Sequence, residues 1–486
     1  MNRSMTHKIC CLFWLCCWAL CLEAQTPQPI RQFLRQPFME GASFSLMVKE
    51  VESGRTVFAY DTLRQMTPAS VMKTVTTATA LELLGPDYRF PTAIEHDGRI
   101  EQGILQGNLY IKGSGDPSLG SSFLTDTVDV IGEWVAALRE RGIQRVEGDV
   151  IADERLVDTE GTSLKWGVED MGTDYGAGSY GLNVFDNCLK IGLQTGQPGS
   201  RPKVKGVEPW VDLRFHNYMT AQRVAKDSCF VMGAPFSNAR YLYGIVPAEK
   251  PYFELKGDIP DPPLFLATYL TQALRQAGIE VVGKPSCYRL LQEAGEWLTN
   301  DRETLVTTYS PPLSELVRIT NFVSHNLYAD ALLKTIGLRY QPKPGEVLSS
   351  FGRGTEVLRS FWAKRGLDVA TLYQVDGSGL AAINKLSTSF MTDFLLYMRK
   401  QAEQSTAFNQ SLPRAGVEGS VRNFWKSKAR TAQLKSGSMT RVKGYAGYVK
   451  QGGKTYAIAL FVNHYACDGR ELNRAIEKML SALFAF

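Results

Sequence analysis

The pattern of apolar and polar positions at the two ends of the chain predicts a single sheet. Residues 44–60 read as two strand-like runs separated by Glu52-Ser53-Gly54, which indicates a β-hairpin. Residues 433–462 contain three further strand-like runs, with a tight glycine turn at Gly452-Gly453 between the last two. The apolar stripe of residues 472–486 predicts a helix packed on this sheet, with a membrane-surface anchor as the alternative.

Two other stretches have helical patterns. An apolar-rich run follows Thr67-Pro68 and ends before Gly85, so Thr67 is the expected N-cap, Pro68 the first helical residue and Gly85 the stop. Residues 314–333 predict a helix, a break and a second helix, with Ser324 and Asn326 at the break.

The middle of the chain, residues 93–292, is rich in short strand-like runs and turns. It contains an internal echo, because residues 138–143 and 274–279 each read as a helix end, a glycine stop and a following strand. The predicted organisation is a first domain of residues 25–92 plus 293–486, with residues 93–292 inserted as one or more accessory domains. The fold class is α/β (α+β).

Three short motifs lie in the predicted first domain: Ser70-Val71-Met72-Lys73, Ser324-His325-Asn326 and Lys435-Ser436-Gly437. Each is common by chance, so the weight lies in their order and their context. Together they match the S-x-x-K, S-x-N and K-[ST]-G set of serine enzymes that react with D-Ala-D-Ala peptides or β-lactams.

The first motif has the residue types that nucleophilic catalysis needs. Ser70 falls in the first turn of a predicted helix, where free backbone amides and the helix dipole stabilise developing negative charge. Lys73 lies on the same face and can accept the serine proton if burial or a second cation lowers its pKa. The alternative is an ordinary helix with a polar face.

The other two motifs supply a proton path and an anion site. Ser324 can pass a proton to a leaving amine, or it is only a helix cap, and the Asn326 amide can hold a substrate backbone. Lys435 and Ser436 can bind a substrate carboxylate from an edge strand, where Gly437 lets a backbone come close. The alternative for this motif is a plain strand start.

With these motifs the chain resembles the class C low-molecular-mass penicillin-binding proteins, the D-alanyl-D-alanine carboxypeptidase/endopeptidase family. The resemblance covers nearly the whole chain after residue 24. Further stretches similar to the family are residues 107–119, 181–187, 376–380 and 415–419. Ser436 stands where the family usually has Thr, which keeps the hydroxyl.

The resemblance implies a serine β-lactamase/transpeptidase-like catalytic domain split by a large, mainly β insertion. It implies that Ser70 forms an acyl-enzyme with Lys73 as base, and that the backbone amides of Ser70 and Ser438 form the oxyanion hole. Ser436, Gly437 and Ser438 would bind the substrate with Lys435. Asp153 of the insertion is expected near the substrate side chain. No metal or other cofactor is implied.

Residues 1–24 resemble a secretory signal, with Arg3 and Lys8 before an apolar run and a cleavage site at Leu22-Glu23-Ala24. We therefore expect an exported, periplasmic protein without a stable membrane anchor. Five of the nine cysteines lie in this segment. The other four, which can form disulfides or remain free thiols, are Cys188, Cys229, Cys287 and Cys467.

The chain has 486 residues and a formal charge of +5, an ordinary globular composition with no nucleic-acid signature. The expected partners are peptidoglycan peptides, with β-lactams as covalent inhibitors. Two alternative functions share the motifs: a β-lactamase, and a non-catalytic sensor or wall-binding protein that is acylated by β-lactams. The large insertion argues against a β-lactamase. Sensors of this kind need a membrane link, which we do not expect here.

Overall fold

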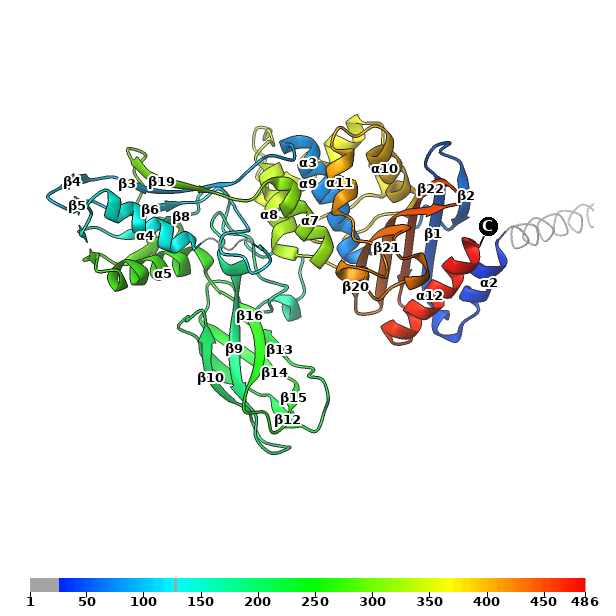
Figure 1. Ribbon diagram of the computed structural model, residues 1–486, viewed down its shortest axis with the longest axis horizontal. Helices are drawn as coiled ribbons and strands as arrows, with labels where there is room; N and C mark the ends of the chain where they lie inside the picture. The colour runs from blue at the N-terminus through cyan, green and yellow to red at the C-terminus, as the bar shows by residue number, and fades with distance from the viewer. Residues whose placement is uncertain (1–25, 126–128, 486) are drawn as a thin grey trace, which may run out of the picture.

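The computed structural model describes residues 26–125 and 129–485, and residues 1–25, including the expected signal segment, lie outside this range. Strands from both ends of the chain form one antiparallel sheet in the order β2-β1-β22-β21-β20 (Figure 1). The five strands are β1 (Ser43–Glu50), β2 (Thr56–Tyr60), β20 (Ala432–Met439), β21 (Val442–Gln451) and β22 (Lys454–Asn463). The sheet predicted from the sequence is therefore present, and the β1–β2 hairpin turns where expected.

Helices cover both faces of this sheet, because its central strand is apolar on both sides. Alternate β22 residues enter two different cores: Ile458 and Leu460 pack under α12 (Gly469–Leu483) and α2 (Gln28–Leu34), whereas Ala459 faces the larger helical layer. The C-terminal helix thus packs on the sheet. The helices of the larger layer are α3 (Met72–Leu84), α7 (Leu313–Val323), α8 (Asn326–Gly337), α9 (Ser350–Lys364), α10 (Thr388–Lys400) and α11 (Ser405–Ser411).

The middle of the chain forms a second group of sheets. β3 (Pro91–His96) leaves the first part, and β19 (Glu303–Tyr309) returns beside it as its antiparallel partner (Figure 1). Two sheets, β18-β8-β6-β3-β19 and β17-β7-β5-β4, share a core with two long helices. The other elements here are β4 (Arg99–Glu101), β5 (Ile104–Gln106), β6 (Leu109–Lys112), α4 (Val130–Glu140), β7 (Arg145–Val146), β8 (Val150–Asp153), α5 (Pro262–Gln276), β17 (Glu280–Val281), β18 (Pro285–Cys287) and α6 (Tyr288–Glu293).

The internal echo of the sequence is a structural repeat. Helices α4 and α5 each end before a glycine with positive φ, Gly142 and Gly278, and each is followed by a short strand. The two strands, β7 and β17, pair in parallel, and so do the next two, β8 and β18. The repeated sequence pattern therefore brings equivalent strands together.

A third group of strands, between β8 and α5, projects as a separate lobe (Figure 1). It contains the sheets β10-β9-β16 and β11-β14-β13 and the pair β12-β15. The strands are β9 (Cys188–Gln194), β10 (Lys203–Glu208), β11 (Arg214–Asn217), β12 (Thr220–Gln222), β13 (Phe230–Met232), β14 (Ala239–Tyr243), β15 (Ile245–Pro247) and β16 (Phe253–Asp258). The residue limits of the predicted domains stay a prediction.

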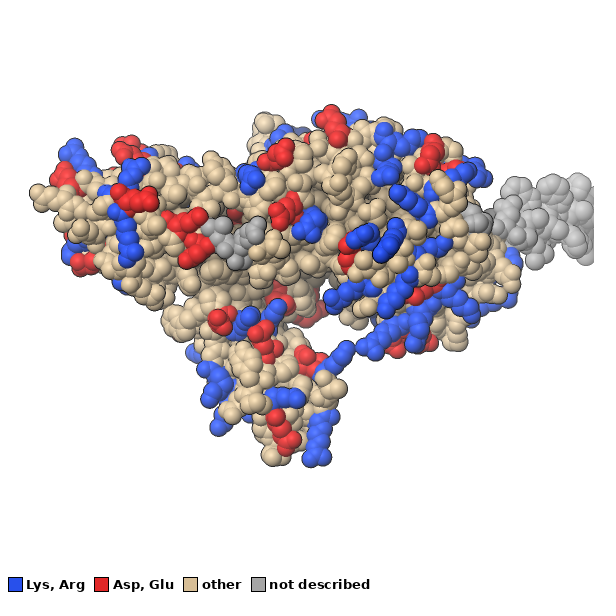
Figure 2. Space-filling model, viewed as in Figure 1, with Lys and Arg blue, Asp and Glu red and all other residues tan. Residues whose placement is uncertain are grey.

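Two further expectations concern cysteines and membranes. The structure leaves Cys188, Cys229, Cys287 and Cys467 as free thiols. Within residues 26–125 and 129–485, no helix has the length and apolar character needed to cross a bilayer. The surface carries charges of both signs, and Figure 2 shows Lys and Arg side chains gathered near α12.

Candidate active site

Ser70 lies in a single 3-10 turn, Ala69–Val71, that leads directly into α3. The helix is therefore shorter at its start than the sequence predicted. Thr67 is not its N-cap: the Thr67 hydroxyl instead donates to the Ala382 carbonyl, 3.1 Å away. The predicted stop is correct, because Gly85 has a φ of 86° and its amide bonds back to Leu81.

Lys73 is completely buried beneath Ser70. Its Nζ lies 2.9 Å from Ser70 Oγ, 2.6 Å from Asn326 Oδ1 and 2.6 Å from the Ser378 carbonyl. The last two atoms only accept hydrogen bonds, whereas a serine hydroxyl can donate or accept. A neutral lysine can thus donate two N–H bonds and use its lone pair to accept the Ser70 proton.

The second motif lies at the predicted break between two helices. Ser324 ends α7 with a left-handed φ of 65°, a conformation that is strained for a residue with a side chain. Its hydroxyl accepts a hydrogen bond of 2.9 Å from Lys435 Nζ. Asn326 begins α8, and its Nδ2 donates to the Tyr175 carbonyl at 2.7 Å. The break thus brings the first and third motifs together.

The third motif lies on β20, the edge strand of the sheet. Lys435 is buried and donates to Ser324 and to the Ser436 carbonyl, whereas the Ser436 hydroxyl lies 2.8 Å from Ser420 Oγ. A Cβ on Gly437 would lie 2.3 Å from the Pro68 carbonyl oxygen and 3.0 Å from the Ser70 amide. Glycine is therefore required for β20 to lie against the Ser70 turn.

The outer edge of β20 presents backbone amides on the side away from β21. The Leu434 amide points away from β21 and donates to the Pro413 carbonyl at 2.9 Å. Pairing with β21 runs without a break through Ser438, and alternate amides of an antiparallel strand point to the same side. The amides of Ser436 and Ser438 therefore point outward too, which is the direction that an oxyanion donor or a peptide partner needs.

Burial controls the ionisation of both lysines. Burial lowers the pKa of Lys73 to about 8, against an opposing influence from the carboxylates of Asp330 and Asp376. Burial, followed by the charges of Lys73 and Lys443, holds the pKa of Lys435 well below its usual value. Repulsion between Lys73 and Lys435 is mutual, so the pair resists carrying two protons. The sequence prediction attributed a neutral Lys73 to Lys435 and partial burial; burial is complete and lowers the pKa of Lys73, whereas the repulsion is a cause of the lowered pKa of Lys435.

Two buried carboxylates, Asp330 and Asp376, hold the loop beside Lys73. Sequence reasoning did not single out either residue. Asp376 accepts hydrogen bonds from the Gly379 and Ala381 amides, and Asp330 accepts from the Gly377 and Ser378 amides. Together they fix the loop whose Ser378 carbonyl contacts Lys73. Burial, aided by Asp376, raises the pKa of Asp330 to about 7. The resemblance of residues 376–380 to the family was the signal for this loop.

The insertion forms one wall of the cleft that contains Ser70. A cavity of about 1060 Å³ is lined by Ser70, Ser324, Asn326 and Ser438, together with Trp166, Asp170 and Tyr175 from the insertion. Trp166 Nε1 also donates to Asp376 at 2.9 Å, which ties this wall to the loop beside Lys73. Sequence reasoning missed these three residues because no local motif marks them.

Asp153 is the one predicted site residue that lies elsewhere. It ends β8, is buried, and pairs with Arg302 at 2.9 Å and Arg155 at 3.1 Å. It is not among the residues that line the cleft. Its expected contact with the substrate side chain stays a prediction, and in the structure its carboxylate pairs with two arginines.

No group of three or more His, Cys, Asp or Glu residues suited to a metal ion occurs in the described ranges. The chain matches the D-Ala-D-Ala carboxypeptidase 3 (S13) family over residues 27–483, which is nearly its whole length. The protein belongs to that family. Membership confirms the predicted family and the predicted activity class, a serine-type D-alanyl-D-alanine peptidase that acts on peptidoglycan.

Curated proteins and a solved structure agree with this assignment. The chain is 25% identical over 445 residues to D-alanyl-D-alanine carboxypeptidase DacB of Haemophilus influenzae, a match that covers 90% of this chain and 89% of that protein. It is 28% identical over 438 residues to the D-alanyl-D-alanine carboxypeptidase of Actinomadura sp. (strain R39), covering 87% and 78%. The structure of penicillin-binding protein 4 from Haemophilus influenzae superposes with a TM-score of 0.80 at 22% identity, covering 94% of this chain and 99% of that one. The predicted fold class is confirmed.

Because Gly437 lies against the Ser70 turn, adding one methyl group at this position should strongly slow acylation. Gly437→Ala should push β20 away from Ser70 and slow acylation by penicillin about a hundredfold, as a displacement of about 1 Å can do. The matched control is Gly206→Ala on β10, where an added Cβ meets nothing within 4 Å. Stopped-flow acylation rates measure both. A Gly437→Ala protein that acylates at the wild-type rate would contradict the close packing.

Proposed function

We propose that Ser70 attacks the carbonyl between two D-alanines, or between D-alanine and a cross-linking diamino acid, and that water then hydrolyses the ester. The observation that carries this is the hydrogen-bonded chain from Ser70 through Lys73 to Asn326, in a cleft closed by Lys435 and Ser324. In the first step the Ser70 Oγ–carbon bond forms and the carbon–nitrogen bond to the leaving amine breaks. In the second, water releases the shortened peptide and restores Ser70.

Lys73 acts as the general base. In its neutral form the two N–H groups donate to Asn326 Oδ1 and to the Ser378 carbonyl, and the lone pair can accept from Ser70. Its pKa of about 8 makes that form accessible near neutral pH. A substrate carboxylate close to Lys435 favours a proton on Lys435. Because the two lysines repel each other, that proton disfavours one on Lys73. Substrate binding therefore promotes the reactive state.

The edge of β20 binds the substrate and stabilises its oxyanion. The outward amide of Ser438, together with the amide of Ser70, supplies two donors for the oxygen that becomes negative in the transition state. Lys435, Ser436 and Ser438 bind the terminal carboxylate. Ser324, bonded to Lys435, passes a proton to the leaving amine, and Asn326 holds the peptide. Residues 93–292 shape the cleft and do no bond chemistry.

The location and partners follow from this reaction. The substrate is a wall polymer, so the protein acts outside the cytoplasm, and we propose that residues 1–24 export it to the periplasm. We propose no nucleic-acid partner and no stable membrane anchor. The basic surface near α12 is suited to an anionic polymer (Figure 2). No comparison supports the β-lactamase or the sensor alternative.

If Ser70 is the nucleophile, Ser70→Ala should abolish both covalent binding of penicillin and cleavage of muropeptides. Wild-type protein should bind fluorescent penicillin covalently and should remove D-alanine from, or cut, purified muropeptides, as mass spectrometry of the products will show. Ser70→Ala should do neither, and Lys73→Arg should lose most activity because a guanidinium supplies no neutral amine. Ser53→Ala, in the β1–β2 turn, is the control. Labelling of Ser70→Ala would overturn the assignment, and rapid turnover of a cephalosporin with intact muropeptides would favour a β-lactamase.

The charge of Lys435 predicts a shift in the pH profile. Lys435→Ala should slow acylation at least about a hundredfold, the effect expected for a positioned electrostatic group. In the complex, where the substrate carboxylate favours a proton on Lys435, removing this cation should raise the pKa of Lys73, so a higher pH is needed to form the neutral amine. The acid limb of the acylation profile should therefore move to higher pH. Lys435→Arg keeps the charge and should leave the limb near its wild-type position. If the acid limb does not move in Lys435→Ala, the charge of Lys435 does not affect the pKa of Lys73.

A further inference from the structure

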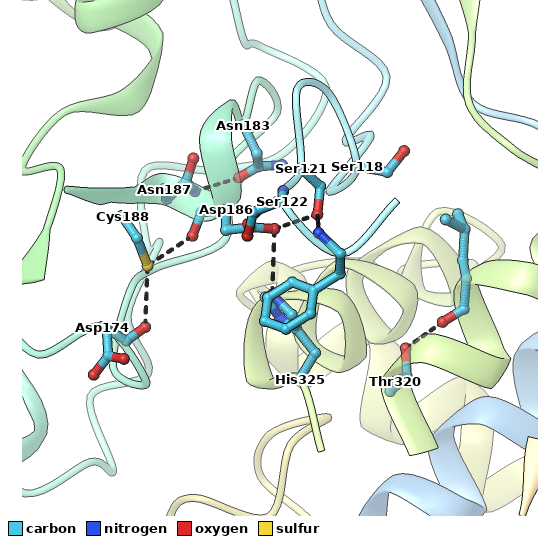
Figure 3. Close-up of polar contacts among 12 residues, drawn as sticks. Ser118, Ser121, Ser122, Asp174, Asn183, Asp186, Asn187, Cys188, Thr320 and His325 are labelled. Atoms are coloured by element: carbon cyan, nitrogen blue, oxygen red, sulfur yellow. Dashed lines mark hydrogen bonds and ion pairs between the residues drawn. The ribbon is translucent and has the colours of Figure 1, made fainter. Parts of the chain in front are cut away.

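Three consecutive side chains at the break between α7 and α8 reach three different parts of the protein. Ser324 bonds to Lys435 on β20, and Asn326 bonds to Lys73 on α3. His325, between them, points toward the insertion, where its Nε2 lies 3.3 Å from Asp186 Oδ1 (Figure 3). The first two contacts belong to the proposed chemistry, and the third has no part in it.

The His325 ring is held firmly on its faces and at one nitrogen. Its side chain is 10% exposed and packs against Phe123 and Tyr328, with ring centroids 4.9 Å and 4.3 Å away. A hydrogen bond here requires a proton on Nε2, because an ionised Asp186 can only accept. The buried Nδ1 has no hydrogen-bond partner among the residues that the structure describes. Asp186 is therefore the polar contact that sets the ring orientation.

Asp186 is presented by an unusual backbone. Phe185, Asp186 and Asn187 have φ angles of 53°, 59° and 51°, a run of left-handed residues without a glycine. The side-chain Nδ2 of Asn187 keeps this turn in place by donating to the Gly178 carbonyl and to Asn183 Oδ1, each at 2.8 Å. These residues belong to the stretch 181–187, which resembles the family but takes no part in the proposed chemistry. Strain of this kind persists only where the surroundings enforce it.

The Asp186 carboxylate has two sets of partners. Ser121 Oγ donates to Oδ1 at 2.5 Å, and the Ser122 amide and hydroxyl donate to Oδ2 at 3.0 Å and 2.8 Å. Figure 3 shows the carboxylate between these serines and His325. The serines fix the carboxylate within the insertion. Because the carboxylate is fixed, its contact with His325 also restrains the Ser324-His325-Asn326 motif.

We propose that Asp186 and His325 form a clamp through which the insertion holds Ser324 and Asn326 in the geometry needed for acylation. Ser324 occupies a strained left-handed conformation, and a clamp on the next residue restrains it. Both clamp residues are positioning residues that act through their neighbours. The proposal rests on the roles given above to Ser324 and Asn326.

Two single substitutions test the clamp. Asp186→Asn removes the charge, and His325→Phe keeps the ring packing but removes the N–H donor. Each should slow penicillin acylation between about tenfold and a hundredfold, with little change in the dissociation constant of the complex that precedes acylation. The double variant should be no slower than the slower single variant, because both act on the same contact, one by removing its charge and the other by removing its donor. His325→Gln, whose amide nitrogen reaches a similar position to Nε2, should recover much of the rate.

The control is a second buried ion pair of the insertion, which is not part of the clamp although Asp258 lies opposite Cys188 in the pairing of β16 with β9. Arg240 and Asp258 pair at 2.7 Å, so Asp258→Asn should lower thermal stability but leave acylation at the wild-type rate. If Asp186→Asn fails to fold, His325→Phe carries the test. The clamp is overturned by a folded variant with wild-type acylation, by independent effects that multiply in the double variant, or by an equal loss in Asp258→Asn. Labelling of Ser70→Ala would instead overturn the proposed function itself.

Discussion

Burial of two lysine side chains in one centre is the constraint on which the rest of the structure depends. A buried cation is costly unless it is paired or neutralised, so Lys73 and Lys435 shift toward the neutral form and resist double protonation. Asp330 and Asp376 partly oppose this shift, which keeps the pKa of Lys73 within reach of neutral pH. In the proposed mechanism, this balance allows Lys73 to accept the proton of Ser70.

The fold places this centre at the junction of three parts. The sheet supplies Lys435 from an edge strand with outward amides, the helical layer supplies Lys73 and the α7–α8 break, and the insertion closes the cleft with Trp166 and Tyr175. Each part contacts the others through backbone as well as side chains. Gly437 against the Ser70 turn and the Tyr175 carbonyl against Asn326 are the clearest cases. The insertion is therefore part of the site that it borders.

Sequence reasoning predicted the sheet, the helix break and the residues of the three motifs because each leaves a local pattern. Thr67 shows its limit: the residue type suits an N-cap, but its hydroxyl bonds to a loop over 300 positions away. Trp166 and Tyr175 have no motif, because their place in the cleft depends on how the insertion folds back. Asp153 was expected at the cleft by resemblance alone, and one of its two arginine partners, the buried Arg302, lies 149 positions away in the sequence.

The most direct test of the lysine centre is the ionisation of Lys73 itself. In protein labelled with carbon-13 at lysine Cε, the Lys73 signal can be assigned by its loss in Lys73→Arg and followed by NMR as the pH is raised. Our account predicts a titration midpoint near the pKa of about 8 set by burial, well below the ordinary lysine value of 10.5. A midpoint at the ordinary value would mean that Lys73 stays charged at neutral pH, and it would contradict the role of Lys73 as the base.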